Sequence, residues 1–218
     1  MQTIAVVPVK SLAGTKSRLA AALDPGERRA LTLATLRGVL AALDRPGIAA
    51  RLVVSVDPAA LDAARGAGAL ALPERPAGGL NAALEQARDR PDVRRADALL
   101  VVLGDLPLLA GGDVGALLAL ADRPGTAVLA PDRHEAGTNA LLLRPPAAMP
   151  FAFGAGSLAR HRALAATRGL AVREYRAPGA ALDLDTPDDL ALLGALGWAP
   201  PGAPAAGRAA PAGEARRP

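Results

Sequence analysis

Residues Ala98–Pro107 read ALLVVLGDLP, and this stretch decides the fold more clearly than any other. Its apolar run, Ala98–Leu103, has the length of a strand and is too short for a helix of the usual length. A strand without polar alternation is typical of a parallel sheet that helices cover on both faces. The abrupt change to Gly104-Asp105 then predicts a turn with a carboxylate at the C-terminal end of the strand.

Further strands and helices are predicted to alternate along the chain. Short apolar or β-branched runs predict strands at Thr3–Val9, Arg51–Val56, Leu70–Leu72, Thr126–Ala130, Asn139–Leu143 and Leu170–Glu174. Longer patterns predict helices at Asp24–Leu43, Ala59–Arg65, Gly78–Arg88, Gly111–Ala121, Ser157–Thr167 and Thr186–Leu196. This alternation predicts an α/β fold with a mainly parallel sheet flanked by helices. We expect a single domain over residues 1–197.

Composition narrows the class of protein. The chain has 218 residues, of which 51% are hydrophobic and 21% charged, as is ordinary for a soluble globular protein. No apolar run approaches the roughly 20 residues of a membrane span, and the N-terminal residues do not resemble a signal peptide. We therefore expect a cytoplasmic protein without membrane contact. The absence of cysteine excludes disulfides, thiolate metal sites and cysteine nucleophiles.

The basic residues favour a small anionic ligand. The net charge is only +4, the arginines are scattered, and the 2% aromatic content is too low for base-stacking surfaces, so we expect no nucleic-acid partner. Residues 198–218 consist mostly of Ala, Pro, Gly and Arg, and this composition predicts a disordered tail.

The chain's two lysines both follow the first predicted strand. They are Lys10 and Lys16, and the other 23 of the 25 basic residues are arginine. Gly14–Ser17 (GTKS) looks like part of a P-loop, but Thr15 separates the glycine from the lysine and the earlier glycine is missing. Charged side chains rather than a glycine cradle must then attract a polyphosphate, and Lys16 and Arg18 are the candidates. A solvated basic loop is the alternative.

Aspartates near strand ends predict a magnesium site. Asp105 follows a buried strand, where a carboxylate is costly unless it is paired or bound to metal. Asp183 and Asp185 are two residues apart, which in an extended segment directs both carboxylates to one side. Three carboxylates suit magnesium, although Asp105 could be only a turn residue. Asp188 and Asp189 are interpreted as helix-capping residues.

Basic groups together with separated aspartates suit the transfer of a nucleotidyl group. In-line displacement at an α-phosphate depends on positioning and on charge neutralisation, which these side chains can supply. A kinase needs similar parts, and a non-catalytic nucleotide-binding module is a further alternative.

Six segments, taken in order, resemble a known family. They are VPVKSLAGTKSRL, GLNAAL, GDLPLL, PDRHEAGTNALLL, FGAGSLARH and LDLDTPDDL, and the resemblance extends from Ile4 to Leu193. The family is the phosphoenolpyruvate or 2-phospho-L-lactate guanylyltransferases of coenzyme F-420 biosynthesis. The resemblance implies a single-domain, Rossmann-like nucleotidyltransferase fold similar to that of the molybdenum cofactor guanylyltransferases. It also implies transfer of GMP from GTP to the phosphate of a three-carbon phosphoacid, with release of pyrophosphate.

The resemblance assigns roles position by position. The residues that resemble the acceptor-binding set are Thr138, Gly154 and Ser157. Those that resemble the magnesium-binding set are Asp105, Asp183 and Asp185. The triphosphate contacts are Lys16 and Arg18, with Lys10 as a third candidate, and the nucleotide side is lined by Gly79, Leu80 and Asn81. We count Lys16, Arg18 and Asp105 as catalytic.

The acceptor residues also have a physical rationale. Gly154–Ser157 precedes a helix, and free N–H groups at a helix N-terminus suit a phosphate or carboxylate. Thr138 could instead be an ordinary strand residue, and Ser157 only a helix cap. An acceptor phosphate is already ionised, so no general base is needed. Accordingly His134 is interpreted as a surface residue and His161 as structural, although His161 could face the acceptor.

The exact chemistry of the partners stays open at this level. Phosphoenolpyruvate, 2-phospholactate and 3-phosphoglycerate differ by a few atoms, and pocket shape selects among them. An acceptor of the molybdopterin type, use of CTP, and a homodimer also remain alternatives.

Overall fold

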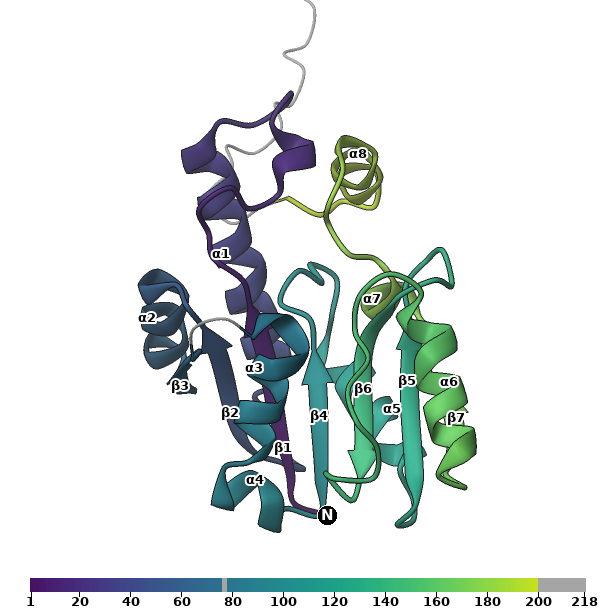
Figure 1. Cartoon of the computed structure of the whole chain (residues 1–218). Coiled ribbons are helices and arrows are strands. Elements are labelled where there is room, and N and C mark those ends of the chain that lie inside the picture. The colour runs from purple at the N-terminus through teal and green to yellow at the C-terminus, as the bar shows by residue number, and fades with distance from the viewer. Residues whose placement is uncertain (76–77, 200–218) are drawn as a thin grey trace, which may run out of the picture.

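The predicted α/β fold is confirmed by the computed structural model, which describes residues 1–75 and 78–199 (Figure 1). One seven-stranded sheet has the order β3-β2-β1-β4-β6-β5-β7. Its strands are β1 (Thr3–Val9), β2 (Ile48–Ser55), β3 (Leu70–Pro73), β4 (Ala98–Val102), β5 (Thr126–Pro131), β6 (Thr138–Arg144) and β7 (Ala171–Glu174). The disordered tail was predicted for residues 198–218, and residues 200–218 lie outside the described residues. Trp198 is ordered, because its N–H donates to the carbonyl of Leu193 and its side chain packs against an apolar cluster.

The sheet is mainly parallel, as predicted, with β6 as the exception. β6 runs antiparallel to both of its neighbours, β4 and β5. The other pairs, β1 with β2, β1 with β4, β2 with β3 and β5 with β7, are parallel. β6 follows β5 after a short loop, and antiparallel strands are the ones that such a loop can join. The first residue of β6 therefore lies at the edge where the parallel strands end.

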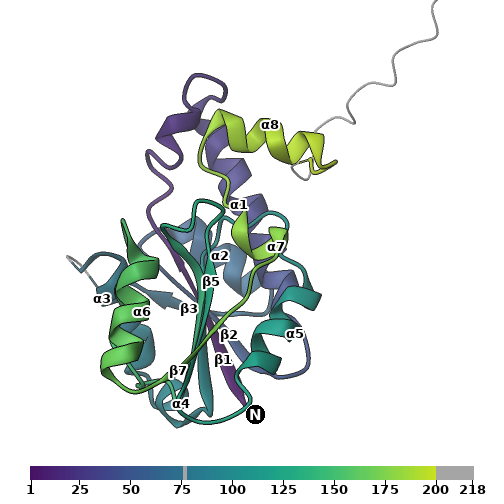
Figure 2. The same cartoon turned by 90° about the vertical axis from the view of Figure 1, so that its right-hand side faces the viewer.

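Helices cover both faces of the sheet (Figure 2). The helices are η1 (Ser17–Leu19), α1 (Pro25–Ala42), α2 (Pro58–Gly66), α3 (Gly79–Arg88), α4 (Pro91–Arg95), α5 (Gly111–Leu120), α6 (Ser157–Thr167), α7 (Pro178–Ala181) and α8 (Pro187–Ala195). Buried residues of α1, α2 and α5 form one core with the sheet, and those of α3, α4 and α6 form the other. Asp24 caps α1 through a capping box with Glu27, as its position before Pro25 predicts.

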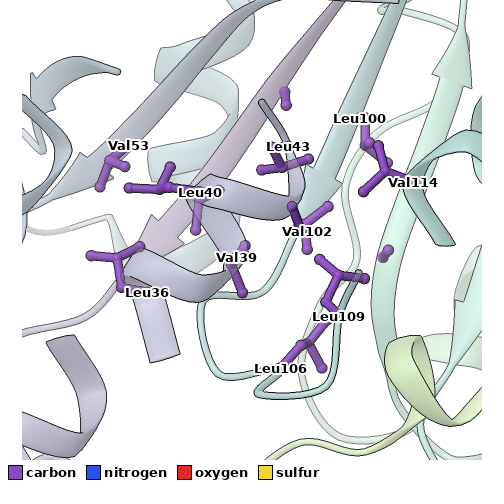
Figure 3. Packing of buried hydrophobic residues seen from close by; sticks show 14 of the residues in the cluster. Leu36, Val39, Leu40, Leu43, Val53, Leu100, Val102, Leu106, Leu109 and Val114 are labelled. Carbon is purple, nitrogen blue, oxygen red and sulfur yellow. The ribbon is translucent and has the colours of Figure 1, made fainter. Parts of the chain in front are cut away.

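Strand β1 shows why its run is apolar at every position after Thr3. Ala5 and Val7 belong to the core under α1, and Ile4 and Val6 to the core under α3, so both faces of the strand are buried. Figure 3 shows the first of these cores, where leucines of α1 approach β2 and β4. A third cluster of Leu19, Leu31, Leu182, Leu184 and Leu193 joins the loop after β1 to α1 and α8.

The short helices η1, α4 and α7 were not predicted. They have three, five and four residues respectively. A segment of this length completes too few turns to display a helical repeat of apolar residues. Its conformation is instead set by proline at the first helical position in α4 and α7.

Candidate active site

A cavity of about 610 Å³ lies at the C-terminal ends of β1 and β4. This volume falls within the range of sites for small molecules and cofactors, roughly 300–1,000 Å³. Its lining includes seven residues singled out from the sequence, Lys10, Lys16, Arg18, Leu80, Asp105, Asp183 and Asp185. The structure therefore brings the predicted triphosphate contacts and the predicted magnesium ligands to one place.

The loop after β1 is held from two sides. From α1, Arg28 donates to the carbonyl of Thr15 over 3.2 Å and to that of Leu23 over 2.8 Å. From the end of β2, Asp57 accepts a hydrogen bond from the backbone N–H of Leu12 over 2.9 Å. The second oxygen of Asp57 accepts from the N–H of Ala59 and so caps α2. The loop is thus a fixed wall of the cavity.

The backbone of this loop passes through the left-handed region twice. Gly14 has φ of 72°, which suits glycine, but Lys16 also has φ of 48° and ψ of 46°. A residue with a Cβ pays about 1–2 kcal/mol for this conformation, so the surroundings of Lys16 must hold it there. The third apolar cluster does so on one side, because Leu19 of η1 is fully buried within it.

The alternation predicted for Asp183 and Asp185 is present. Leu182 and Leu184 are buried in the third apolar cluster, while the two aspartates between and after them line the cavity. The N–H of Leu184 donates to the carbonyl of Asp105 over 3.1 Å, which places this segment against the end of β4. The spacing of two residues therefore directs both carboxylates to the same side, as expected for an extended segment.

Asp189 holds the same segment from the C-terminal side. Its Oδ2 accepts from the N–H of Asp185 over 3.0 Å and from the N–H of Thr186 over 2.7 Å. It closes the capping box of α8 and forms an ion pair with Arg133. The structural role predicted for Asp189 is confirmed, and Asp188 lies beside it in the first turn of α8, also as predicted.

Lys16 is paired with two of the three predicted magnesium ligands, Asp105 and Asp185. Its Nζ lies 3.6 Å from Oδ2 of Asp105 and 3.3 Å from Oδ1 of Asp185, and it also donates to the carbonyl of Leu184. The Lys16 side chain is only 5% exposed. In this arrangement the ammonium group neutralises the aspartates, and its predicted contact with a triphosphate stays a prediction. Arg18 and Lys10 are both exposed.

The aspartates of the cavity disfavour one another's charge. Burial raises the pKa of Asp105, the ammonium of Lys16 opposes this effect, and the charge of Asp185 adds to it. Burial also raises the pKa of Asp183, followed by repulsion from Asp105. One oxygen of Asp105, Oδ1, is buried and has no hydrogen-bond partner among the described residues. Such a set of oxygens would be stabilised by a divalent cation.

The carboxylates are not yet gathered around one point. Within residues 1–75 and 78–199, no three acidic or histidine side chains are close enough together to hold a metal ion. The donor set thus fits magnesium in its chemistry, while the ammonium of Lys16 lies among the carboxylates. Magnesium binding stays a prediction.

The predicted acceptor residues lie outside the cavity lining. Thr138 is the first residue of β6, and Leu103 after β4 donates to the carbonyl of the next residue, Asn139, over 2.9 Å. The antiparallel direction of β6 therefore brings Thr138 to the same edge of the sheet as Asp105. Thr138 and Ser157 are each 2% exposed. Gly154, with φ of 119°, and Gly156, with φ of 68°, need the conformational freedom of glycine.

The three residues predicted for the nucleotide side face different surroundings in the structure. Leu80 lines the main cavity and, together with Gly79 and Lys10, a smaller neighbouring cavity of about 200 Å³. Asn81 lines neither. Its amide instead donates to the carbonyl of Phe153 over 3.1 Å and accepts from the N–H of Phe153 over 2.8 Å. Asn81 therefore ties α3 to the loop that carries Gly154.

Two positioning interactions were missed in the sequence. Asp57 follows strand β2, and its hydrogen bond to Leu12 joins residues 45 apart, which no local pattern reveals. His161 was interpreted as structural, and it is fully buried between Thr138 and Ala152. A histidine one helical turn after Ser157 was the available signal. His134 is exposed, as predicted.

Comparison with known proteins identifies the family. A family model described as guanylyl transferase CofC like matches residues 3–197. The chain belongs to this family. A phosphoenolpyruvate guanylyltransferase of Rubrobacter xylanophilus is 52% identical over 90% of this chain and 96% of its own length. The enzyme of the same name from Sphaerobacter thermophilus is also 52% identical, over 93% and 97%. A 2-phospho-L-lactate guanylyltransferase of Methanothermobacter thermautotrophicus is 38% identical over 87% and 83%.

Solved structures support the fold. A protein described as a nucleotide-diphospho-sugar transferase, from Desulfovibrio desulfuricans, superposes with a TM-score of 0.71 over 88% of this chain and 85% of its own, at 16% identity. A CMP:2-keto-3-deoxy-manno-octonic acid synthetase complexed with CTP gives 0.59 over 90% and 98%, at 17% identity. The predicted family, its fold and the nucleotidyltransferase class are therefore confirmed. In the described part of the chain no helix is long and apolar enough to cross a membrane.

Proposed function

We propose that this chain transfers GMP from GTP to the phosphate of phosphoenolpyruvate, in the biosynthesis of coenzyme F-420. The observation that carries the proposal is 52% identity to a phosphoenolpyruvate guanylyltransferase over 90% of the chain. 2-Phospho-L-lactate is the second candidate acceptor, because a relative of that name is 38% identical. Family membership weighs against a kinase and against a non-catalytic nucleotide-binding module.

The reaction exchanges one phosphorus–oxygen bond for another. A phosphate oxygen of the acceptor attacks the α-phosphorus of GTP, and the bond from that phosphorus to the bridging oxygen of the β-phosphate breaks. Pyrophosphate leaves with the electron pair. Because the attacking phosphate is already ionised at neutral pH, the chain needs no general base. This agrees with a cavity whose lining contains lysine, arginine and aspartate but no histidine.

The basic and the acidic residues of the cavity would have different roles. Lys16 and Arg18 would bind the triphosphate, and Asp105, Asp183 and Asp185 would hold magnesium. The bound ion would neutralise phosphate oxygens as negative charge develops on them. When the aspartates turn to such an ion, Lys16 would be released from them toward the phosphates. Leu80 and Gly79 would lie beside the nucleoside.

The acceptor would bind on the other side of Asp105. Thr138 and Ser157 supply hydroxyl groups, and Gly154–Gly156 supplies free backbone N–H groups before α6. All of these groups can donate hydrogen bonds to a phosphate or carboxylate. This side is closed in the structure, since Thr138 and Ser157 are 2% exposed. The loop before α6 would therefore have to shift to admit the acceptor.

The decisive experiment is a competition assay. Purified protein is given GTP with phosphoenolpyruvate, 2-phospholactate and 3-phosphoglycerate together in the presence of magnesium. Pyrophosphate release is measured, and the product is identified by mass. We expect the guanylylated phosphoenolpyruvate to dominate. Tight GTP binding without pyrophosphate release from any acceptor would contradict the proposal and favour a binding module, and turnover with CTP instead of GTP would correct the nucleotide.

A further inference from the structure

His161 joins two parts of the predicted acceptor site. It lies on α6 and is fully buried, and each of its two ring nitrogens takes part in a hydrogen bond. Nδ1 lies 3.0 Å from the hydroxyl of Thr138, and Nε2 lies 3.1 Å from the backbone nitrogen of Ala152. The ring also packs edge-on against Phe153, with 4.9 Å between the ring centroids. Its orientation is therefore fixed from three directions.

The contact with Ala152 determines which nitrogen carries the hydrogen. A backbone N–H can only donate, so Nε2 must accept through its lone pair. A neutral imidazole has a single N–H, which is then on Nδ1. A protonated ring would direct a second N–H against that of Ala152. Burial, together with the charge of Arg160, lowers the pKa of His161 to about 4, so the ring is neutral at physiological pH.

The direction of the next hydrogen bond follows. Since Nδ1 carries the hydrogen, it donates to the hydroxyl oxygen of Thr138. The hydroxyl of Thr138 must then use its own hydrogen elsewhere, and the described residues offer it no acceptor. Ser157, one helical turn before His161, likewise has a hydroxyl without a partner in the described part of the chain. Two hydroxyl donors from β6 and α6 are thus left for a ligand.

We propose that His161 is a positioning residue, which by donating from Nδ1 makes the Thr138 hydroxyl a hydrogen-bond donor to an anionic oxygen of the phosphoacid. The inference rests on the proposed function, because that function supplies the phosphoacid. In the opposite tautomer Nδ1 would accept the hydroxyl hydrogen of Thr138, which could then no longer be donated to a ligand. Through Nε2 the same ring holds Ala152 and hence the loop that leads to Gly154.

The tautomer can be observed directly, without any measurement of activity. The chain has only two histidines, so a protein labelled with ¹⁵N-histidine gives few signals, and the exposed His134→Gln variant leaves those of His161 alone. We expect at pH 7 a neutral ring with hydrogen on Nδ1 and a bare Nε2. A ring with hydrogen on Nε2, or a charged ring at pH 7, would overturn the inference.

Two substitutions separate the two contacts of the ring. In His161→Asn the side-chain amide can replace Nδ1 but does not reach Ala152, whereas in His161→Gln it can replace Nε2 but not Nδ1. We expect His161→Gln to raise the KM for the phosphoacid about tenfold, which corresponds to about 1.4 kcal/mol. The KM for GTP should stay unchanged, and His161→Asn should have the smaller effect. Equal losses of kcat in both variants, with unchanged KM for the phosphoacid, would show a merely structural role.

A second background tests whether His161 acts through Thr138. Thr138→Val removes the hydroxyl, so His161→Gln should add no further increase to the KM for the phosphoacid in that background. Independent, multiplying effects would overturn the inference. If His161→Gln does not fold, the tautomer observed in the wild-type protein is the test of the inference.

The outcomes also distinguish this inference from the proposed function. A wild-type protein inactive with every phosphoacid contradicts the proposed function. An active wild-type protein, with an unchanged KM for the phosphoacid in a folded His161→Gln, contradicts only this inference.

Discussion

The two sides of the predicted site are built from different interactions. On the nucleotide side, the ammonium of Lys16 is paired with Asp105 and Asp185, and the charges of Asp105, Asp183 and Asp185 repel one another. On the acceptor side, Thr138, Ser157 and His161 are neutral and buried, and His161 and Thr138 are already joined by a hydrogen bond. The hydrogen bonds that orient His161 and Thr138 are thus formed before substrate arrives, and the loop before α6 then has to shift to admit the acceptor, while the nucleotide side awaits a charge rearrangement.

This difference predicts how each side responds to substitution. Removing a charge from the nucleotide side should impair turnover more than folding, because the aspartates there are held at an energetic disadvantage. Removing a hydrogen bond from the acceptor side should affect both stability and binding, since a buried partner is left unsatisfied. A variant that breaks this division would show that the two sides are not distinct.

Asp105→Asn should give the largest effect. We expect kcat to fall by at least about 10³-fold, because the amide cannot supply the charge that a magnesium site requires. The midpoint of thermal unfolding should stay unchanged or rise, since a buried carboxylate with a raised pKa is lost. Pyrophosphate release and thermal denaturation measure the two quantities. The matched control is Asp62→Asn, at an exposed aspartate paired with Arg65, which should change neither by much. Near-normal turnover in Asp105→Asn would remove Asp105 from the metal set.

His161 should make the stability of the protein depend on pH. Its pKa is about 4 in the folded protein, below the ordinary value of 6.5, so the unfolded chain binds more protons between these values. This contribution is fully present above pH 6.5 and is lost as pH falls toward 4, by about 3 kcal/mol at most. The measurement is the free energy of unfolding of wild type minus that of His161→Gln, from pH 7.5 to pH 4, so that carboxylate titrations common to both cancel. Parallel curves would contradict the prediction.

Much of the fold could be predicted because local patterns carry it. The apolar run Ala98–Leu103 became β4 (Ala98–Val102), and the cap at Asp24 begins α1. The direction of β6 could not be predicted in the same way. A strand that is buried on both faces shows no alternation, and its residues say nothing about which way it runs. Yet that direction is what brings Thr138 to the same edge of the sheet as Asp105.

In the candidate site too, some features could be predicted from local patterns and others could not. The spacing of Asp183 and Asp185 predicted that both face the same side, and both line one cavity while the alternating Leu182 and Leu184 are buried. The interaction partners of these groups could not be predicted, because they are distant in the sequence. The Nζ of Lys16, for example, donates to Asp185, which is 169 positions away. Individual residues could thus be named from type and spacing, while the network that orients them arises only in the fold.

Lys16→Ala should affect the nucleotide side alone. We expect the KM for GTP to rise about tenfold, or about 1.4 kcal/mol, and the KM for the phosphoacid to stay constant. Lys10→Ala is the matched comparison, since Lys10 is the chain's other lysine, lines the same cavity and is exposed; its effect should be smaller. Steady-state kinetics with each substrate varied separately provide the measurement. An unchanged rate and KM for GTP in Lys16→Ala would exclude the triphosphate role.

Asn81→Ala should give the smallest effect and the one that tests the boundary between the two sides. Asn81 joins α3, whose Leu80 lines the cavity, to Phe153 beside Gly154 through two hydrogen bonds. Its loss leaves both backbone groups of Phe153 without these partners, so the free energy of unfolding should fall by about 1–2 kcal/mol. The KM values for GTP and for the phosphoacid should both rise, by roughly threefold. A rise in one KM alone would assign Asn81 to a single side, and the two sides would then be independent of this link.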